Sequence, residues 1–204
     1  MKKLNETHPL IPSEEGNRSR CFWVQNSFDE MIKYHDTEWG VPIHDDKIHF
    51  EFLILEGAQA GLSWSTILKR REGYRKAFAN FDVSKVAKYD VSKFQELLLN
   101  PEIIRNKLKI RSEINNAKLF LEIQNEYGSF SKYIWSFVNN KPIINHWKTP
   151  KEIPANSKES DALSKDLIKR GFKFVGSTIM YAHMQATGLV MDHTEDCFRF
   201  QELS

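Results

Sequence analysis

The sequence predicts an all-α protein, and three observations support this fold class. Apolar residues recur every three or four positions along most of the chain, capping residues precede several of these segments, and no segment shows a convincing strand-like alternation of apolar and polar residues. At 204 residues, of which 41% are apolar, the chain is long enough for one domain with a proper core. No apolar run approaches the ~20 residues of a membrane span, so we expect no membrane association.

The first half of the chain predicts a series of helices. Residues 27–30, with the sequence SFDE, form a capping-box pattern ahead of a helix over 31–39. Residues 45–61 would be apolar on most sides of a helix, which predicts a helix buried in the core. Ser63 is placed to cap a helix over 64–81. Shorter helical pieces follow at 83–88 and 91–99, and the Asn-Pro pair at 100–101 ends the second of them.

The second half is also helical. A long amphipathic helix over 108–128 ends at Gly128, a residue typical of helix C-termini. Further helices are expected over 129–138, 160–170 and 177–189, with a proline-containing loop over 140–157. These patterns predict a compact all-helical domain whose two ends can meet.

The distribution of charge predicts the class of partner, and the N-terminal residues predict the cellular compartment. The net charge is only +2, but three stretches, at 68–76, 104–111 and 164–174, are distinctly basic. Such stretches are usually solvated faces, and three of them favour a polyanionic partner. Residues 1–19 are polar and lack the apolar core of a signal peptide, so we expect a flexible extension, a cytoplasmic protein and reduced thiols.

Both cysteines lie near histidines. His193 and Cys197 are four residues apart, one helical turn, and Cys21 is followed by His35 near the other end of the chain. Together the four could form a tetrahedral Cys2His2 site. Two alternatives fit the spacing: a free buried cysteine beside a surface histidine, or a Cys21–Cys197 disulfide.

A candidate pocket surrounds Glu56, which follows four apolar residues on the helix predicted to be buried. A buried carboxylate is costly unless it is paired or used. The small residues of 57–61 leave space beside the helix, and Trp64 follows two turns on. These features suit a flat, electron-poor ring, although Glu56 could instead lie at an edge and meet a lysine. Further aromatic residues nearby are Trp23, Tyr34 and Trp39, although aromatic residues on helices more often belong to the core than to a ligand site.

Residues 163–186 read as a helix, a glycine-bounded turn and a second helix. The turn GFKFVG, at 171–176, could offer backbone N–H groups and Lys173 to a phosphate, or it could be an ordinary helical corner. Asp192 follows this region; it could be a general base, but we favour an N-cap for the last helix.

Taken together, these motifs closely resemble the bacterial 3-methyladenine DNA glycosylase I family. The resemblance rests on CFWV (21–24), YHDTEWGVP (34–42), LEGAQAGLSWSTILKRREGYRKAF (55–78), GFKFVGSTIMY (171–181), QATGLVMDH (185–193) and Cys197. It covers residues 20–200, which we expect to form the glycosylase domain between the extension at 1–19 and a tail at 201–204.

The resemblance implies the helix-hairpin-helix glycosylase fold, with a structural zinc joining the N- and C-terminal segments. The implied zinc ligands are Cys21, His35, His193 and Cys197. The residues implied to hold the excised base are Glu56, Tyr34 and Trp64, with Trp23 nearby, and Glu56 carries the catalytic role. The hairpin implied to grip the DNA backbone contains Gly171, Phe172, Lys173 and Gly176.

The implied activity is base-excision repair. The enzyme would flip 3-methyladenine out of alkylated double-stranded DNA and hydrolyse its N-glycosidic bond, releasing the free base. No lysine stands out as a Schiff-base nucleophile, so we expect a monofunctional enzyme without lyase activity. We also expect this enzyme to be a monomer. Three rivals rank below it: a zinc-stabilised DNA-binding domain, a metalloenzyme with catalytic zinc, and a small-molecule binder.

Overall fold

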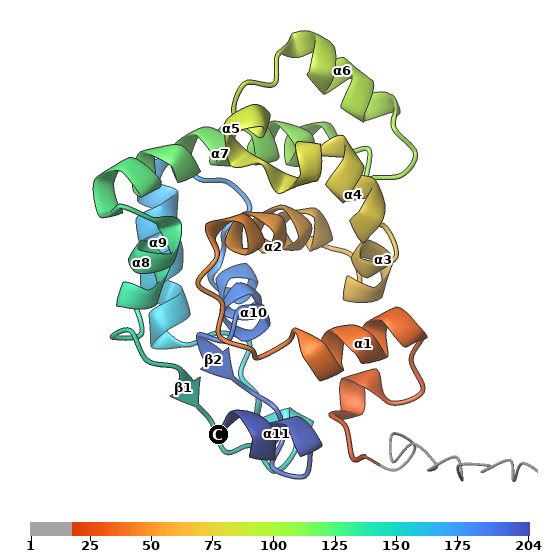
Figure 1. Cartoon of the computed structure of the whole chain (residues 1–204), viewed down its shortest axis with the longest axis vertical. Coiled ribbons are helices and arrows are strands. Elements are labelled where there is room, and N and C mark those ends of the chain that lie inside the picture. Colours follow the sequence, from red (N-terminus) through yellow and green to blue (C-terminus); the bar gives the residue numbers. More distant parts are fainter. Residues whose placement is uncertain (1–17) are drawn as a thin grey trace, which may run out of the picture.

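The computed structural model describes residues 18–204, a bundle of helices arranged around one central helix (Figure 1). Residues 1–17 of the predicted extension lie outside the described residues. The first half contains η2 (Phe22–Val24), α1 (Asp29–Thr37), α2 (Asp46–Gln59), α3 (Trp64–Leu68), α4 (Arg71–Ala77), η3 (Ala79–Phe81), α5 (Val83–Val86) and α6 (Val91–Leu99). The second half contains α7 (Lys107–Tyr127), α8 (Phe130–Ser136), β1 (Ile143–Ile144), η4 (Pro150–Glu152), α9 (Lys158–Arg170), α10 (Ser177–Ala186), β2 (Val190–Met191) and α11 (Phe198–Leu203).

Helix α2 is the centre of the molecule, as its apolar sequence predicts. All ten residues from His49 to Ala58 are buried, and α2 contacts α3, α4, α7, α8 and α10. Its N-terminus is capped by the Asp45 side chain, which accepts from the Lys47 N–H. Because residues 49–58 of α2 are buried, a polar group among them is held in a dry environment.

Two apolar clusters hold the helices together. The larger one joins α2 to α7, α8, α9 and α10, and it includes the stacked rings of Phe120 and Phe130, 4.0 Å apart. The smaller one joins η2 and α1 to Cys197. The Phe198 N–H also donates to the Ser19 carbonyl at 2.9 Å. The two ends of the described chain therefore pack together, with α1 and α11 at the end of the molecule opposite α6 (Figure 1).

Several helix ends were predicted correctly and others were not. Ser63 caps α3 by accepting from the Thr66 N–H, and Gly128 ends α7 with a left-handed φ of +83°. The capping box at 27–30 is wrong, because α1 begins at Asp29 with Phe28 at its N-cap and no side-chain cap bond. The predicted helix over 64–81 is divided into α3, α4 and η3, where Asn80 takes a φ of +55°.

The expectation of a chain without strands is also wrong in one place. β1 and β2 form a two-residue parallel pair, with Ile143 opposite Val190 and Ile144 opposite Met191. Two residues cannot show a period-2 pattern, which explains why the sequence did not reveal them. The pair attaches the loop after α8 to the segment after α10, and this brings η4 towards α10.

The described helices include none that combines the length and apolar character needed to cross a membrane.

Candidate active site and metal cluster

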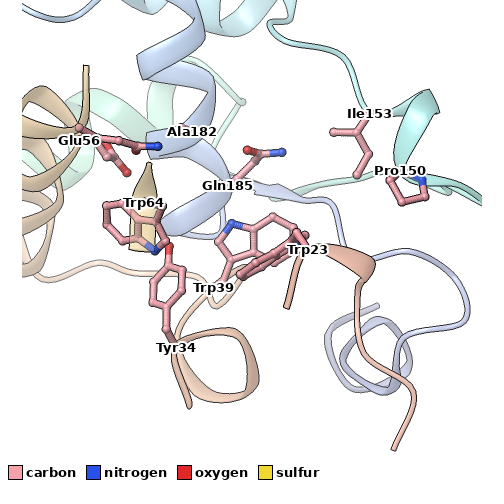
Figure 2. Close-up of a pocket in the computed structure, with 10 residues that line it drawn as sticks. Trp23, Tyr34, Trp39, Glu56, Trp64, Pro150, Ile153, Ala182 and Gln185 are labelled. Carbon is pink, nitrogen blue, oxygen red and sulfur yellow. The ribbon is translucent and has the colours of Figure 1, made fainter. Parts of the chain in front are cut away.

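A cavity of about 460 Å³ lies between the N-terminal segment, α2, α3 and α10, and its size suits a small planar ligand (Figure 2). Five of its lining residues are among the candidates identified from the sequence: Trp23, Tyr34, Trp39, Glu56 and Trp64. The rest of the lining was not predicted and consists of Gln59, Pro150, Ile153, Ala182 and Gln185. These come from separate elements, and no local pattern in the sequence marks them.

Glu56 is buried at 2% exposure and lies inside the cavity wall. Its Oε2 atom lies 2.9 Å from Nδ1 of His183 on α10, while Oε1 has no hydrogen-bond partner among the described residues. Glu56 therefore does not meet a lysine at an edge. Burial raises its pKa well above the usual range, because the charged form loses its hydration.

The aromatic residues form one continuous group, in which the ring centroids of Trp23 and Tyr34 lie 6.4 Å apart. The rings of Tyr34 and Trp64 have centroids 5.3 Å apart, and those of Trp23 and Trp39 are 5.1 Å apart. Figure 2 shows all four directed towards one space, with the Glu56 carboxylate next to Trp64. The Trp64 Nε1–H is buried and lacks a partner within the described part of the chain. The cavity thus contains one unpaired acceptor, Glu56 Oε1, and one unpaired donor.

Asp192 does not cap the last helix, because α11 begins at Phe198. It is 1% exposed and accepts hydrogen bonds from four side chains at 2.6–2.8 Å: Tyr181, Gln185, Asn145 and Trp147. These bonds occupy both carboxylate oxygens, and one of them fixes the amide of Gln185 at the cavity wall. Asp192 therefore positions its neighbours and is not placed as a free base.

The four proposed metal ligands meet in one buried cluster. The ligand atoms of Cys21, His35, His193 and Cys197 all lie within 4.8 Å of one another. His193 Nδ1 lies 3.4 Å from Cys21 Sγ and 3.5 Å from Cys197 Sγ. With Zn–S near 2.3 Å and Zn–N near 2.05 Å, a tetrahedral ion requires an S···N edge of about 3.6 Å, which these distances match.

The geometry excludes the alternatives for the cysteines and corrects one assumption. Both thiols are free, and neither histidine is at the surface. His193 and Cys197 do not share a helix, since both precede α11 on a turn. The His-x3-Cys spacing was therefore significant for a different geometric reason: the turn, not a helical face, brings the two together.

The second nitrogen of each cluster histidine has its own partner. His35 Nδ1 lies 2.7 Å from Asp36 Oδ1, and Asp36 in turn accepts from Arg20. His193 Nε2 lies 2.9 Å from the Trp39 carbonyl. Metal-bound histidines typically donate their second N–H in this way, so the surroundings fit a metal bound by Nε2 of His35 and Nδ1 of His193. The cluster could hold a metal ion, and four protein ligands would leave no open position for water.

The predicted hairpin connects α9 to α10. Gly171 ends α9 with a φ of +100°, and Gly176 is the N-cap of α10. The Phe172 side chain is 1% exposed and belongs to the core, so it cannot contact a ligand at the surface. The N–H groups of residues 171–173 are already used, that of Lys173 by the Asn116 side chain at 3.0 Å. Among the described residues, the N–H groups of residues 174–176 and of the first turn of α10 remain for an anion.

Comparisons with known proteins fit this arrangement. Residues 23–200 match the family model described as methyladenine glycosylase. The chain is 50% identical over 179 residues to DNA-3-methyladenine glycosylase 1 of Escherichia coli strain K12, covering 87% of this chain and 95% of that protein.

Solved structures agree in fold. A crystal structure of 3-methyladenine DNA glycosylase I superimposes with a TM-score of 0.85 at 47% identity, covering 88% of this chain and 98% of that one. A single-residue variant of 3-methyladenine DNA glycosylase I in complex with 3-methyladenine gives 0.83 at 37% identity, covering 85% and 94%. The chain belongs to the methyladenine glycosylase family.

Proposed function

We propose that this protein excises 3-methyladenine from alkylated double-stranded DNA by hydrolysing the N-glycosidic bond. The observation that carries the proposal is the buried carboxylate of Glu56, which lines an aromatic cavity and whose Oε1 has no partner among the described residues. A module that only binds DNA gains nothing from such a group. Solved relatives named 3-methyladenine DNA glycosylase I, one of them in complex with 3-methyladenine, support the choice of base.

The damaged nucleotide must leave the duplex before it can enter the cavity. Flipping costs a few kcal/mol, and contacts to the flanking phosphates offset this cost. The first turn of α10 supplies N–H groups, and the nearby Lys173 supplies a positive charge. Gly171 and Gly176 shape the turn that presents them, whereas Phe172 anchors it from within the core. These contacts position the DNA but do not read its sequence.

Inside the cavity, the base is held by charge and by stacking. N3-methylation places a positive charge on adenine, and ionised Glu56 accepts hydrogen bonds from the amino edge of the ring. Tyr34 and Trp64 stack on the cation, with Trp23 at the outer side; such a contact contributes up to about 2 kcal/mol when desolvated. The Trp64 N–H donates to a ring acceptor.

Hydrolysis then requires little acid catalysis, because the cationic base is already a good leaving group. The sugar gains oxocarbenium character, and the electrons of the glycosidic bond neutralise the ring. Water adds to C1′ and releases one proton to solvent. Ionised Glu56 favours the cationic ring up to this point. No lysine is among the residues of the described chain that line the cavity. This supports a monofunctional enzyme that leaves the abasic strand intact.

The Cys2His2 cluster would bind zinc as a structural ion. Cys21 and His35 come from the N-terminal segment, and His193 and Cys197 precede the last helix, so one ion would tie the two ends together. Because zinc would stabilise the backbone that carries His35, it would also fix the adjacent Tyr34 at the cavity.

Chromatography of the bases released from alkylated duplex DNA tests the proposal. We expect 3-methyladenine in the soluble fraction and 7-methylguanine left in the DNA, with the abasic strand uncut at neutral pH. Binding of DNA and zinc without any released base would favour a zinc-stabilised DNA-binding domain instead. Cleavage of the strand would contradict the monofunctional mechanism alone.

A further inference from the structure

A buried lysine of α7 closes the C-terminal end of α2. Lys109 is 6% exposed, and its Nζ atom donates to the carbonyl oxygens of Ala58 and Ala60, at 2.7 Å each. The last carbonyl groups of a helix have no partner within the helix, and a lysine can satisfy them. These two bonds join the first turn of α7 to the end of α2, just beyond Glu56.

The position of Lys109 is unfavourable for α7 itself. It is the third residue of a helix that begins at Lys107, and a positive charge near a helix N-terminus opposes the helix dipole. Burial lowers the pKa of Lys109, and the charge of Glu113 opposes this shift. Glu113 does not hydrogen-bond to the ammonium, because neither of its oxygens has a partner among the described residues. A buried lysine with these costs is expected only where another element needs its bonds.

The turn that Lys109 holds forms one side of a second cavity. At Ala60 the chain leaves the helical conformation with a ψ of +115°, and Gly61 takes a left-handed φ of +76°. A cavity of about 190 Å³ lies between this turn, residues 60–62, and the first turn of α10. It adjoins the larger cavity, because three residues line both: Glu56, Gln59 and Ala182.

We propose that Lys109 is a positioning residue for base release from DNA, which holds the turn at 60–62 so that the second cavity can receive the deoxyribose of the flipped nucleotide. The inference deepens the proposed function and rests on it. A base in the larger cavity and a phosphate at the first turn of α10 are joined through the sugar, and the second cavity borders both places. The free base has no sugar, so its binding does not depend on this turn.

Substitutions at Lys109 test this role in single-turnover release of 3-methyladenine from alkylated duplex DNA. Lys109→Met removes both bonds and retains an unbranched side chain of similar length. We expect release to be about 10-fold slower, because the sugar is misplaced relative to the bound base, and affinity for free 3-methyladenine to be unchanged. Lys109→Arg retains the donors and should recover most of the rate. Lys118→Met, at an exposed position on the opposite face of α7, is the matched control and should release the base at the wild-type rate.

A cycle with Gly61→Ala distinguishes positioning of the turn from general stabilisation of the fold. A Cβ atom at Gly61 meets nothing within 4 Å, so Gly61→Ala disturbs the turn through its φ of +76° and not by collision. If Lys109 acts through this turn, the double variant should release the base about as slowly as the slower single variant. Effects that multiply in the double variant would overturn the proposal. If Lys109→Met does not fold, Gly61→Ala tests the turn alone, and an unchanged rate of release overturns the proposal.

The same measurements separate this proposal from the proposed function. Folded Lys109→Met that releases the base at the wild-type rate contradicts the role of Lys109 and leaves the proposed function intact. An equal loss of release rate and of affinity for the free base also contradicts it, since Lys109 would then support the larger cavity instead of the turn. Absence of base release by wild type contradicts the proposed function itself, and the role of Lys109 with it.

Discussion

At the scale of single residues, two of the side chains that line the cavity carry a polar atom without a hydrogen-bond partner in the described part of the chain. The Trp64 N–H and Glu56 Oε1 are both buried without partners among the described residues. An unsatisfied buried polar group costs about 1–3 kcal/mol of stability, so the fold maintains these groups at the expense of its own free energy of unfolding. This is the expected signature of a binding site.

The substitution Trp64→Phe distinguishes the stability cost of the unpaired indole N–H from its contribution to ligand affinity. The phenyl ring preserves stacking but removes the unpaired N–H, so we expect an unchanged or higher melting temperature. Affinity for free 3-methyladenine should fall about fivefold, the equivalent of one hydrogen bond of about 1 kcal/mol. Thermal unfolding and calorimetry measure the two effects. Unchanged affinity would show that the indole N–H does not contact the base.

The residue identities were the most predictable part of the site. Glu56 was recognisable because a carboxylate interrupts a buried apolar helix, and Cys21 and Cys197 because they are the only cysteines. His183 and Gln185 were not, because a histidine and a glutamine on an amphipathic helix carry no signal of their own. Their roles depend on how α10 crosses α2, which no local pattern encodes.

At the scale of elements, the cluster of Cys21, His35, His193 and Cys197 joins η2 and α1 to the segment before α11. We expect Cys197→Ser to lose the metal and at least about 2 kcal/mol of unfolding free energy, since structural zinc contributes directly to folding. Metal analysis and urea unfolding measure these losses. A chelator should reproduce the loss in wild type; a variant as stable as wild type would contradict the zinc assignment.

The hairpin between α9 and α10 is the second element with a testable role. Lys173 is exposed in the turn that precedes α10, so Lys173→Ala should weaken DNA binding at every sequence and reduce the slope of log affinity against log salt concentration by about 1. The matched control is Lys88→Ala, which removes an exposed lysine after α5. Equal effects of the two substitutions on a titration with duplex DNA would exclude a specific contact at the hairpin.

Element prediction succeeded where periodicity and caps are strong and failed at short pieces. The long helix α7 and the buried helix α2 were predicted almost to their ends. The break between α3 and α4 and the β1–β2 pair depend on tertiary contacts, and segments of two to five residues do not display a period. These short pieces nevertheless bring η4 and Trp64 to the cavity.

At the scale of the whole molecule, burial of neutral histidines links stability to pH. The pKa of His49 is lowered from 6.5 to about 3, so the unfolded chain binds a proton that the native protein does not. The stabilisation from this group is complete above pH 6.5 and is lost as the pH falls towards 3. It changes the free energy of unfolding by about 1.4 kcal/mol per pH unit within that window.

His49→Gln removes this linkage. Between pH 6 and pH 5, the free energy of unfolding of the variant should fall less than that of wild type, by about 1 kcal/mol. Urea unfolding at the two pH values measures the difference, and contributions from the metal cluster cancel because both proteins retain it. Parallel losses would mean that His49 is charged in the native state.

The most direct test of the whole account compares wild type with Glu56→Gln in the release of 3-methyladenine from alkylated duplex DNA. We expect wild type to release the base and Glu56→Gln to release it roughly 100-fold more slowly, the scale of losing one electrostatic group at a reacting centre. DNA affinity and melting temperature should be retained. Glu122→Gln, at an exposed position of α7, is the matched control and should behave as wild type. Equal rates for wild type and Glu56→Gln would remove Glu56 from the site and contradict the account.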